Sequence, residues 1–306
     1  MENCIKISVV ICTYNRAAYI AAALESLIAQ TIAKSSFEVI VANNNSTDNT
    51  ELICKHFIAA HPDYALHFLN EPKQGASFAR NTGAALAKGD LLCFMDDDAI
   101  AAPDYLEKII DFFTTHPDAG GLGGRIIPKY IPEEPKWMSY YVSSLVGNFD
   151  YNKNICVFQP GKYPLESNMI IKKADFKAIG GFNENLPGVV GTIRIGGEGK
   201  ELFYRLQAIG KKIYYHPGII VQHVVEVNKL TKEYMYRVAS GIGRGERRRV
   251  LAINRWAYVK KIMEYQFKLG ASVILAFQYT LQGNPAKAWP VIQFRIDAFK
   301  GLLNQS

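Results

Sequence analysis

The first third of the chain alternates short apolar runs, rich in β-branched residues, with longer stretches of helical periodicity. In the longer stretches the apolar residues recur every three or four positions. The pattern predicts strands at 5–14, 37–44, 65–71 and 90–98, separated by helices at 17–30, 47–61 and 76–89. Strands that alternate with helices of this length pair in parallel through right-handed crossovers. We therefore expect an α/β fold with a Rossmann-like, mostly parallel sheet and helices on both faces.

The pattern becomes less regular in the middle of the chain. Five prolines and several aromatic residues between positions 123 and 165 favour irregular or hairpin structure. A strand and helix are predicted at 167–182, and a helix, turn and strand at 197–224. From Lys232 onward only helices are predicted, and the apolar run around 273–281 is too short to span a bilayer. We expect a first domain at 1–228 and a C-terminal helical extension at 229–306.

Polar side chains follow each strand of the predicted parallel sheet. The four groups are Thr13, Tyr14, Asn15 and Arg16, then Asn43, Asn44, Asn45 and Ser46, then Asn70 and Glu71, and finally Asp96, Asp97 and Asp98. The carboxyl ends of parallel strands meet at one edge of the sheet, and ligands of open α/β sheets bind there. The sequence therefore predicts a ligand site at this edge.

Three consecutive carboxylates at the end of an apolar strand call for a compensating charge. Two carboxylates about 4 Å apart repel by about 4 kcal/mol at the effective dielectric of a protein surface. Because side chains alternate along a strand, Asp96 and Asp98 point to one side and Asp97 to the other. Mg²⁺ or Mn²⁺ accepts such carboxylates together with phosphate oxygens and water. We predict a divalent cation at this strand end; the alternative is a charged strand end that leads into a capped helix.

The positive charge of the chain is concentrated in its last quarter. The whole chain carries +7, yet residues 229–306 hold 14 lysines and arginines against four acidic residues, which is +10. Such an excess favours an anionic partner, and we expect the helices from Lys232 onward, with Arg247, Arg248 and Arg249, to dock on an anionic membrane surface without spanning it. A solvated basic face is the alternative.

The cysteines and the opening residues bear on the compartment. The five cysteines are odd in number, scattered, and lack Cys-x-x-Cys spacing, which indicates buried free thiols in a reducing compartment. The first residues enter a predicted strand without the charged and apolar regions of a signal peptide. We expect a cytoplasmic protein, or one at the inner face of the cell membrane.

Five ordered blocks of the sequence resemble the family 2 glycosyltransferases of GT-A fold. They are SVVICTYNRAAYIAAALESLIAQT, FEVIVANNNSTDNT, GASFARNTGAALAKGDLLCFMDDDAIAAPDYL, SNMIIKKADFKAIGGFNENL and GEGKELFYRLQAIGKKIYYHPGIIVQH. The resemblance implies an inverting transfer of sugar from a UDP- or GDP-type donor to a glycan or lipid-linked acceptor in bacterial polysaccharide or lipid-linked oligosaccharide synthesis. Asp96 and Asp98 then resemble the Asp-x-Asp element, which holds the cation that stabilises the departing diphosphate.

The resemblance also assigns roles around the donor and the acceptor. It implies donor contacts for Thr13, Tyr14, Asn15, Arg16, Asn43, Asn45, Arg80, Asn81 and Asp97, and a donor–acceptor junction at Asn168 and Met169. Arg80 and Asn81 would lie beside the diphosphate. Asn43 stands where the family usually has an aspartate that contacts base and ribose, which leaves the nucleotide open.

A second departure concerns the general base. The family commonly has Glu-Asp where this chain has Glu198 followed by Gly199. Glu201 shares a helix face with Glu198, so we expect Glu198 to be the base and Glu201 to support it, although a merely acidic helix start is the alternative. His223, at a strand end, would be a metal ligand, a hydrogen-bonding group in the acceptor site, or a structural residue.

Two other functions fit parts of this pattern. A nucleotidyltransferase would also use paired aspartates and Mg²⁺, but it would need a glycine-rich basic loop after the first strand, and ICTYNRAAYI has none. A non-catalytic binding protein of degenerate transferase fold would tolerate Asn43 and Gly199. We expect a glycosyltransferase that uses Mg²⁺ or Mn²⁺ and has no nucleic-acid partner.

Overall fold

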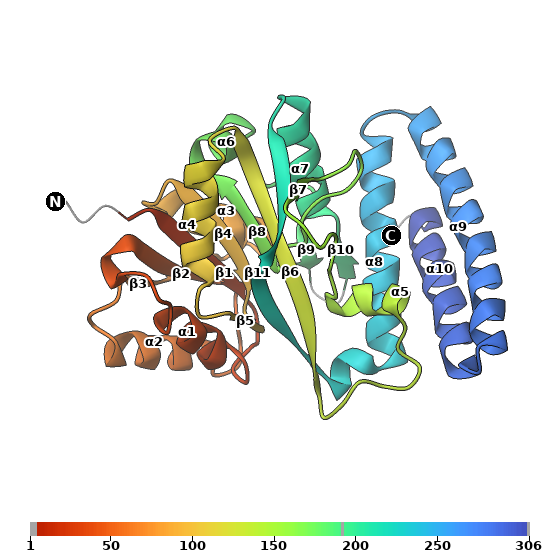
Figure 1. Cartoon of the computed structure of the whole chain (residues 1–306), viewed down its shortest axis with the longest axis horizontal. Helices are drawn as coiled ribbons and strands as arrows, with labels where there is room; N and C mark the ends of the chain where they lie inside the picture. The colour runs from red at the N-terminus through yellow and green to blue at the C-terminus, as the bar shows by residue number, and fades with distance from the viewer. Residues whose placement is uncertain (1–4, 191–192, 305–306) are drawn as a thin grey trace. The chain divides into compact units, whose positions relative to one another are not determined.

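The computed structural model describes residues 5–190 and 193–304 (Figure 1). The strands are β1 (Ile7–Thr13), β2 (Phe37–Asn43), β3 (Leu66–Asn70), β4 (Leu91–Asp96), β5 (Ala99–Ala101), β6 (Ala119–Ile131), β7 (Cys156–Val157), β8 (Asn168–Lys172), β9 (Gly188–Val190), β10 (Ile193–Ile195) and β11 (Lys212–Glu226). The α-helices are α1 (Ile20–Ile28), α2 (Thr50–Ala60), α3 (Ala76–Leu86), α4 (Tyr105–Thr115), α5 (Tyr140–Ser143), α6 (Lys173–Ala178), α7 (Glu198–Ala208), α8 (Lys232–Leu251), α9 (Arg255–Leu281) and α10 (Ala288–Leu303).

One large sheet organises the first part of the chain. Its strand order is β3-β2-β1-β4-β8-β6-β11-β5, and β7 pairs with β11. The first four strands pair in parallel, as the alternation of strands and helices predicts. β8 then pairs antiparallel with both β4 and β6, and β11 pairs antiparallel with β5 and β7. The sheet is therefore mixed, because the stretch between β6 and β8 has no α-helix longer than the four-residue α5 and supplies no helical crossover.

Helices cover both faces of this sheet, as expected. Val9 and Ile11 of β1 belong to a core that includes residues of α1, α2 and α4, whereas Val10 belongs to a second core with residues of α3, α6 and α7. Alternate residues of a strand face opposite sides, so a strand buried on both faces is apolar throughout. This explains why the first strand reads as a continuous run of apolar residues.

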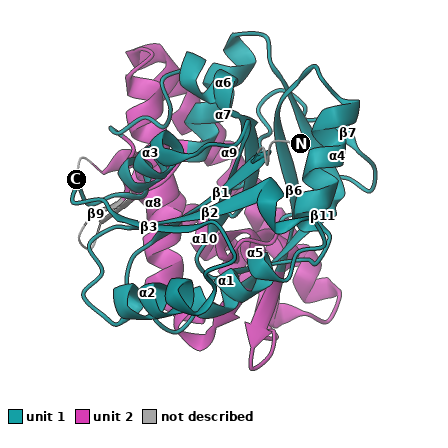
Figure 2. Ribbon diagram, turned by 90° about the vertical axis from the view of Figure 1, so that its left-hand side faces the viewer, with its two compact units in different colours: residues 1–127, 149–185, 199–223 teal, residues 128–148, 186–198, 224–306 magenta. Residues whose placement is uncertain are grey.

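The chain divides into two compact units (Figure 2). The first comprises residues 1–127, 149–185 and 199–223, and the second comprises 128–148, 186–198 and 224–306. The expected boundary between 228 and 229 stays a prediction. The second unit also contains two stretches that precede this position, 128–148 and 186–198. It has its own apolar core, built from α5, α8 and α10 together with Val225.

The C-terminal region is helical from Lys232 onward, as the sequence predicts. The apolar run that the sequence shows at 273–281 is the last third of the 27-residue helix α9. Within residues 5–190 and 193–304, no helix is both long and apolar enough to cross a bilayer.

Candidate active site

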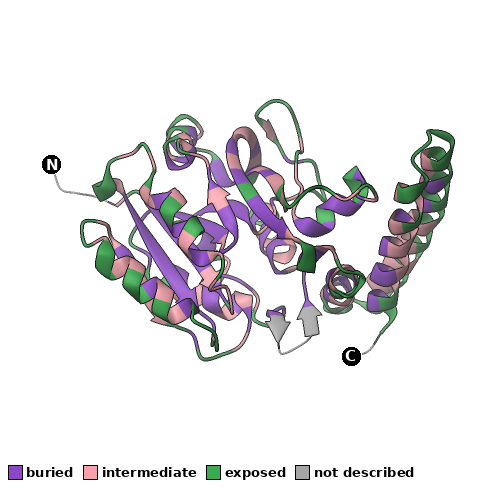
Figure 3. Ribbon diagram, turned by 90° about the horizontal axis from the view of Figure 1, so that it is seen from below, coloured by how far each residue is buried: buried purple, intermediate pink, exposed green. Residues whose placement is uncertain are grey.

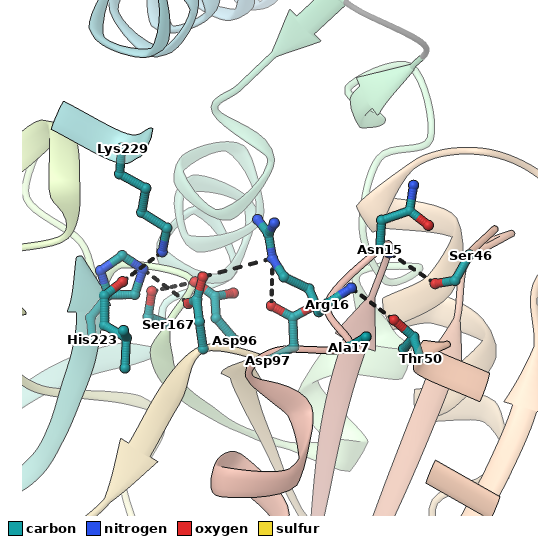
Figure 4. A network of polar contacts seen from close by, with 12 residues as sticks. Asn15, Arg16, Ala17, Ser46, Thr50, Asp96, Asp97, Ser167, His223 and Lys229 are labelled. Carbon is teal, nitrogen blue, oxygen red and sulfur yellow. Dashed lines mark hydrogen bonds and ion pairs between the residues drawn. The ribbon is translucent and has the colours of Figure 1, made fainter. Parts of the chain in front are cut away.

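The register of two short strands brings a histidine to the carboxylates. β4 ends at Asp96, Asp97 and Asp98 form a turn, and β5 begins at Ala99. β5 pairs antiparallel with β11 so that Ala99 lies opposite His223. His223 Nε2 consequently lies 3.0 Å from Asp98 Oδ1. Figure 4 shows His223, Asp96 and Asp97 at this end of the sheet. One ligand atom each from Asp96, Asp98 and His223 lies within 4.8 Å of the others, and we call these three residues the Asp-Asp-His cluster.

Two arginines lie against the three carboxylates. Arg16 Nε is 3.2 Å from Asp97 Oδ1 and 3.8 Å from Asp98 Oδ2, and Arg80 Nη2 is 3.6 Å from Asp96 Oδ1. Burial raises the pKa of Asp97 to about 7, and the charge of Asp98 adds to this effect while Arg16 opposes it. The turn thus concentrates negative charge that the arginines only partly offset.

The cluster has the chemistry of a divalent-cation site. Two carboxylates and an imidazole can converge on one ion, and Asp98 and His223 are both buried. Carboxylates suit Mg²⁺ and Mn²⁺, and imidazole nitrogen is a common ligand of transition metals. The donor set therefore fits a divalent cation.

Ser167 supports the cluster, although the sequence analysis does not single it out. Its hydroxyl donates a hydrogen bond to Asp96 Oδ2. Ser167 immediately precedes Asn168 in the SNMIIKK block, so its place in that block is the only signal that the sequence contains.

The loops after β1 and β2 are shaped by asparagines. Asn15 and Asn45 have φ angles of 54° and 64°, in the left-handed region that asparagine adopts more readily than most residues. The Asn15 side chain accepts a hydrogen bond from the Thr47 amide at 2.7 Å, and Asn45 Nδ2 donates to Pro72 O at 2.7 Å. Both residues connect the ends of neighbouring strands. Tyr14, which directly precedes Asn15, is exposed, and Thr13 is fully buried at the end of β1.

Asn43 has a structural reason to be an amide. Its Nδ2 donates to Asn70 Oδ1 at 2.8 Å, while its Oδ1 accepts from the Ser46 amide at 3.2 Å. A carboxylate could accept the second hydrogen bond but could not donate the first. The neighbouring Asn44, which the sequence analysis gives no role, is also buried and holds the loop after β3 through Glu71 O, Lys73 O and the Gly75 amide.

Arg80 and Asn81 face different surroundings on α3. Arg80 is buried, points to Asp96, and its guanidinium lies 5.4 Å from the centre of the Phe182 ring. Asn81 instead forms two hydrogen bonds with the backbone of Phe182. Its Nδ2 donates to Phe182 O at 3.0 Å, and its Oδ1 accepts from the Phe182 amide at 2.8 Å. The structure therefore brings Arg80 to the carboxylates and ties Asn81 to the loop that follows α6.

Asn168 and Met169 are both inside the first unit. The Asn168 side chain accepts from the Tyr105 hydroxyl and donates to Arg125 O and Ile219 O, all within 3.1 Å. It thereby ties β8 to β6, β11 and α4. Met169 is fully buried in the core on the opposite face.

The start of α7 contains two carboxylates, and a third from the segment before β8 lies against it. Glu198 is buried and is the first residue of the helix. Glu201 accepts two hydrogen bonds of 2.7 Å from Arg205, which also donates to the backbone oxygens of Ile179 and Gly181. Glu166, which the sequence analysis gives no role, accepts a hydrogen bond of 3.1 Å from the Gly199 amide.

The chain is similar to known glycosyltransferases. Residues 8–180 match the profile of the family described as Glycosyl transferase family 2. The chain is 26% identical over 270 residues to glucosyl-dolichyl phosphate glucuronosyltransferase of Haloferax volcanii, which covers 84% of this chain and 83% of that protein. It is 29% identical over 234 residues to validoxylamine A glucosyltransferase of Streptomyces hygroscopicus, covering 67% of this chain and 52% of the relative.

Solved structures show the same fold at lower identity. A mannosyltransferase from Pyrobaculum calidifontis, in complex with GDP-Man and Mn²⁺, superposes with a TM-score of 0.68 at 18% identity, covering 99% of this chain and 88% of that one. Residues 1–349 of TarS from S. aureus, in complex with UDP, superpose with a TM-score of 0.53 at 17% identity, covering 96% and 90%. These likenesses confirm the GT-A fold that the sequence blocks imply.

Proposed function

Since the chain belongs to glycosyl transferase family 2, we propose that it transfers a sugar from a nucleotide-sugar donor to an acceptor hydroxyl with the help of a divalent cation. The Asp-Asp-His cluster is the observation that carries this proposal. Asp96, Asp98 and His223 would hold Mn²⁺ or Mg²⁺. The cation would supply Lewis-acid stabilisation of the diphosphate leaving group.

The residues around the cluster support a donor diphosphate at the same edge of the sheet. Arg16 and Arg80 place two guanidinium groups beside the carboxylates. Guanidinium groups form bidentate hydrogen bonds with phosphate oxygens. Thr13, Tyr14, Asn43 and Asn45 remain proposed contacts to the nucleoside. Asn15 and Asn81 contribute to the donor site by fixing the loops described above, and Asn168 by joining β8 to β6 and β11.

The transfer also needs a group that takes the proton of the acceptor hydroxyl. We assign this role to Glu198, the buried carboxylate at the start of α7. As the acceptor oxygen bonds to the anomeric carbon, its proton passes to the Glu198 carboxylate and the bond from sugar to diphosphate breaks, with inversion at that carbon. Glu201 supports the helix through its ion pair with Arg205.

Similar proteins narrow the substrate classes. The structures with GDP-Man and with UDP support a nucleotide-sugar donor of either kind. A glucosyl-dolichyl phosphate glucuronosyltransferase and a minor teichoic acid biosynthesis protein are among the relatives. We therefore propose that the acceptor is a glycan or a lipid-linked sugar in the synthesis of a polysaccharide or a lipid-linked oligosaccharide.

The metal assignment is tested by replacing Asp98 with asparagine. Asp98→Asn removes one charged ligand, so titration calorimetry should detect no Mn²⁺-dependent binding of the donor. Asp104→Asn is a matched control, because this partly exposed aspartate lies near in sequence but pairs with Lys108. Binding of Mn²⁺ and donor by Asp98→Asn with parental affinity would show that the assignment is wrong.

The base assignment is tested by comparing two glutamine variants. Glu198→Gln should lower turnover by about 10²–10⁴, the usual contribution of general-base catalysis, while donor binding is retained. Glu201→Gln should act on thermal stability, because it breaks the ion pair with Arg205. If Glu198→Gln transfers sugar at the parental rate and Glu201→Gln does not, the two roles are reversed.

A further inference from the structure

One face of α9 carries a continuous line of exposed large apolar side chains. Its members are Trp256, Val259, Met263, Phe267, Ile274, Phe277 and Leu281, and they are between 41% and 79% exposed. Their spacing of three, four or seven residues places them on one side of the helix. We call these seven residues the α9 stripe. Over 27 residues α9 is about 40 Å long, so the stripe runs along almost its whole length.

The opposite side of α9 is packed within the second unit. Ser272 and Ala276 are buried, and Tyr265, Leu275 and Tyr279 pack against the apolar core that contains Val291 and Phe294 of α10. The helix therefore has one face that the fold uses and one apolar face that the fold leaves exposed. Figure 3 shows exposed residues, in green, along the C-terminal helices.

Basic residues accompany the stripe. Arg248, Arg255 and Lys260 are exposed around the turn between α8 and α9, where Ile253 and Trp256 are each 62% exposed. The Lys260 ammonium lies 5.8 Å from the centre of the Trp256 ring. Tryptophan beside lysine and arginine is typical of the boundary between lipid headgroups and acyl chains.

The acidic residues of 229–306 do not neutralise the positive charge beside the α9 stripe. Of the four acidic residues in 229–306, Glu246 and Asp297 are buried and Glu233 lies in the first turn of α8. Glu264 is the only one on α9, and it is paired with Lys261 and Lys268 at 2.5 Å each. A second copy of α9 would bring one basic flank against another, so the charge pattern favours an anionic surface over self-association.

A cavity opens beside the stripe. It has a volume of about 280 Å³ and is lined by Tyr141, Lys268, Ile274, Leu275, Val291 and Arg295, among others. Arg295 and several apolar side chains line this opening, whereas Lys268 is already paired with Glu264.

We propose that the α9 stripe lies in the interface of an anionic lipid bilayer, with Trp256 and the apolar side chains among the acyl chains and Arg248, Arg255 and Lys260 at the phosphates. Such helices lie in the plane of the membrane with their apolar face about 5–10 Å deep. The arginine run 247–249 contributes less than the sequence indicates, since Arg247 donates to the Tyr258 hydroxyl and Arg249 pairs with Glu246.

Flotation with liposomes tests this proposal without any assay of sugar transfer. The full chain should float with phosphatidylcholine mixed with phosphatidylglycerol, and much less with phosphatidylcholine alone. Phe267→Glu/Ile274→Glu should stay at the bottom of the gradient. Leu52→Glu/Leu86→Glu is the matched control, since it adds the same charge at two exposed leucines of α2 and α3 and should float like the parent.

Removal of charge tests the electrostatic part. Arg255→Gln/Lys260→Gln should weaken binding to the anionic liposomes by about thirtyfold, equivalent to about 2 kcal/mol. Added salt should also weaken binding of the parent protein to the anionic liposomes, because it screens the attraction between the charges.

Fluorescence gives a second readout that does not depend on the charged variants folding. Anionic liposomes should shift the tryptophan emission of the parent to shorter wavelength, and Trp256→Phe should lose most of that shift. Equal flotation of the parent with neutral and anionic liposomes, or no flotation with either, overturns the proposal. So does a parental dimer in solution that Phe267→Glu/Ile274→Glu separates into monomers, because the stripe would then be an interface between two copies.

Discussion

At the scale of single residues, the Glu166 carboxylate lies directly against Gly199. A Cβ atom at Gly199 would lie 2.7 Å from Glu166 Oε1, and the Gly199 amide already donates to that oxygen. A side chain at 199 would displace the carboxylate and break this hydrogen bond. Glu166 thus occupies the space that a side chain at position 199 would enter.

We predict that Gly199→Asp lowers the free energy of unfolding by about 1–3 kcal/mol, the usual cost of losing a hydrogen bond to a charged group. The new carboxylate would also repel Glu166. The same substitution in a Glu166→Ala background should cost much less, because the two side chains no longer compete. Denaturant unfolding of the four members of this double-mutant cycle measures the coupling, and additive effects would contradict the steric explanation.

Two cysteines are predicted to be unreactive in the folded protein. Burial raises the pKa of both Cys54 and Cys93 to about 12, so the reactive thiolate is scarce at neutral pH. Mass spectrometry after brief treatment with iodoacetamide should find both thiols unmodified in the native protein and modified after unfolding in guanidinium. Rapid modification in the native state would mean that this region opens easily.

At the scale of elements, α8 and α10 approach each other closely because glycines face the contact. A Cβ at Gly243 would lie 2.0 Å from Ala298 O, and one at Gly301 would lie 2.0 Å from Ser240 O. Gly270 on α9 has nothing within 4 Å of its Cβ position. Gly301 and Gly270 are therefore helical glycines with the same backbone preference and opposite surroundings.

We predict opposite effects of alanine at these two glycines. Gly270→Ala should stabilise the protein by about 0.5–1 kcal/mol, because alanine favours the helix and meets no neighbour. Gly301→Ala gains the same preference but must separate α8 from α10, so it should destabilise the protein by about 1–3 kcal/mol. Thermal unfolding of both variants beside the parent checks the signs, and equal shifts would contradict the close approach.

At the scale of the whole molecule, ligand binding should report on the complete donor site. A donor at 100 times its dissociation constant adds about 2.7 kcal/mol to the stability of a protein that binds it only when folded. When a panel of UDP- and GDP-sugars is tested with Mn²⁺ present, the sugars that carry the correct nucleotide should therefore raise the melting temperature of the protein. EDTA should abolish the shift, and an equal shift with EDTA would show that the donor binds without the cation.

Local patterns in the sequence determined the order of the elements and the chemistry of the strand ends. Alternation of strands and helices, three aspartates after an apolar strand, and the positive C-terminal region are all properties of neighbouring residues. They predicted the α/β sheet and the helices after Lys232, and the resemblance of five sequence blocks implied the family; each of these expectations is confirmed. Such features follow from periodicity and propensity, which act within one or two turns of chain.

Only the tertiary structure decided which distant residues meet. The pairing of β5 with β11 brings His223 to Asp98, and strand order brings Arg16 to Asp97. It also decided that Asn81 holds a loop rather than facing the carboxylates, and that the exposed side of α9 is apolar. These outcomes depend on strand register and on which helix face the core covers, and both are set by packing between segments far apart in the sequence.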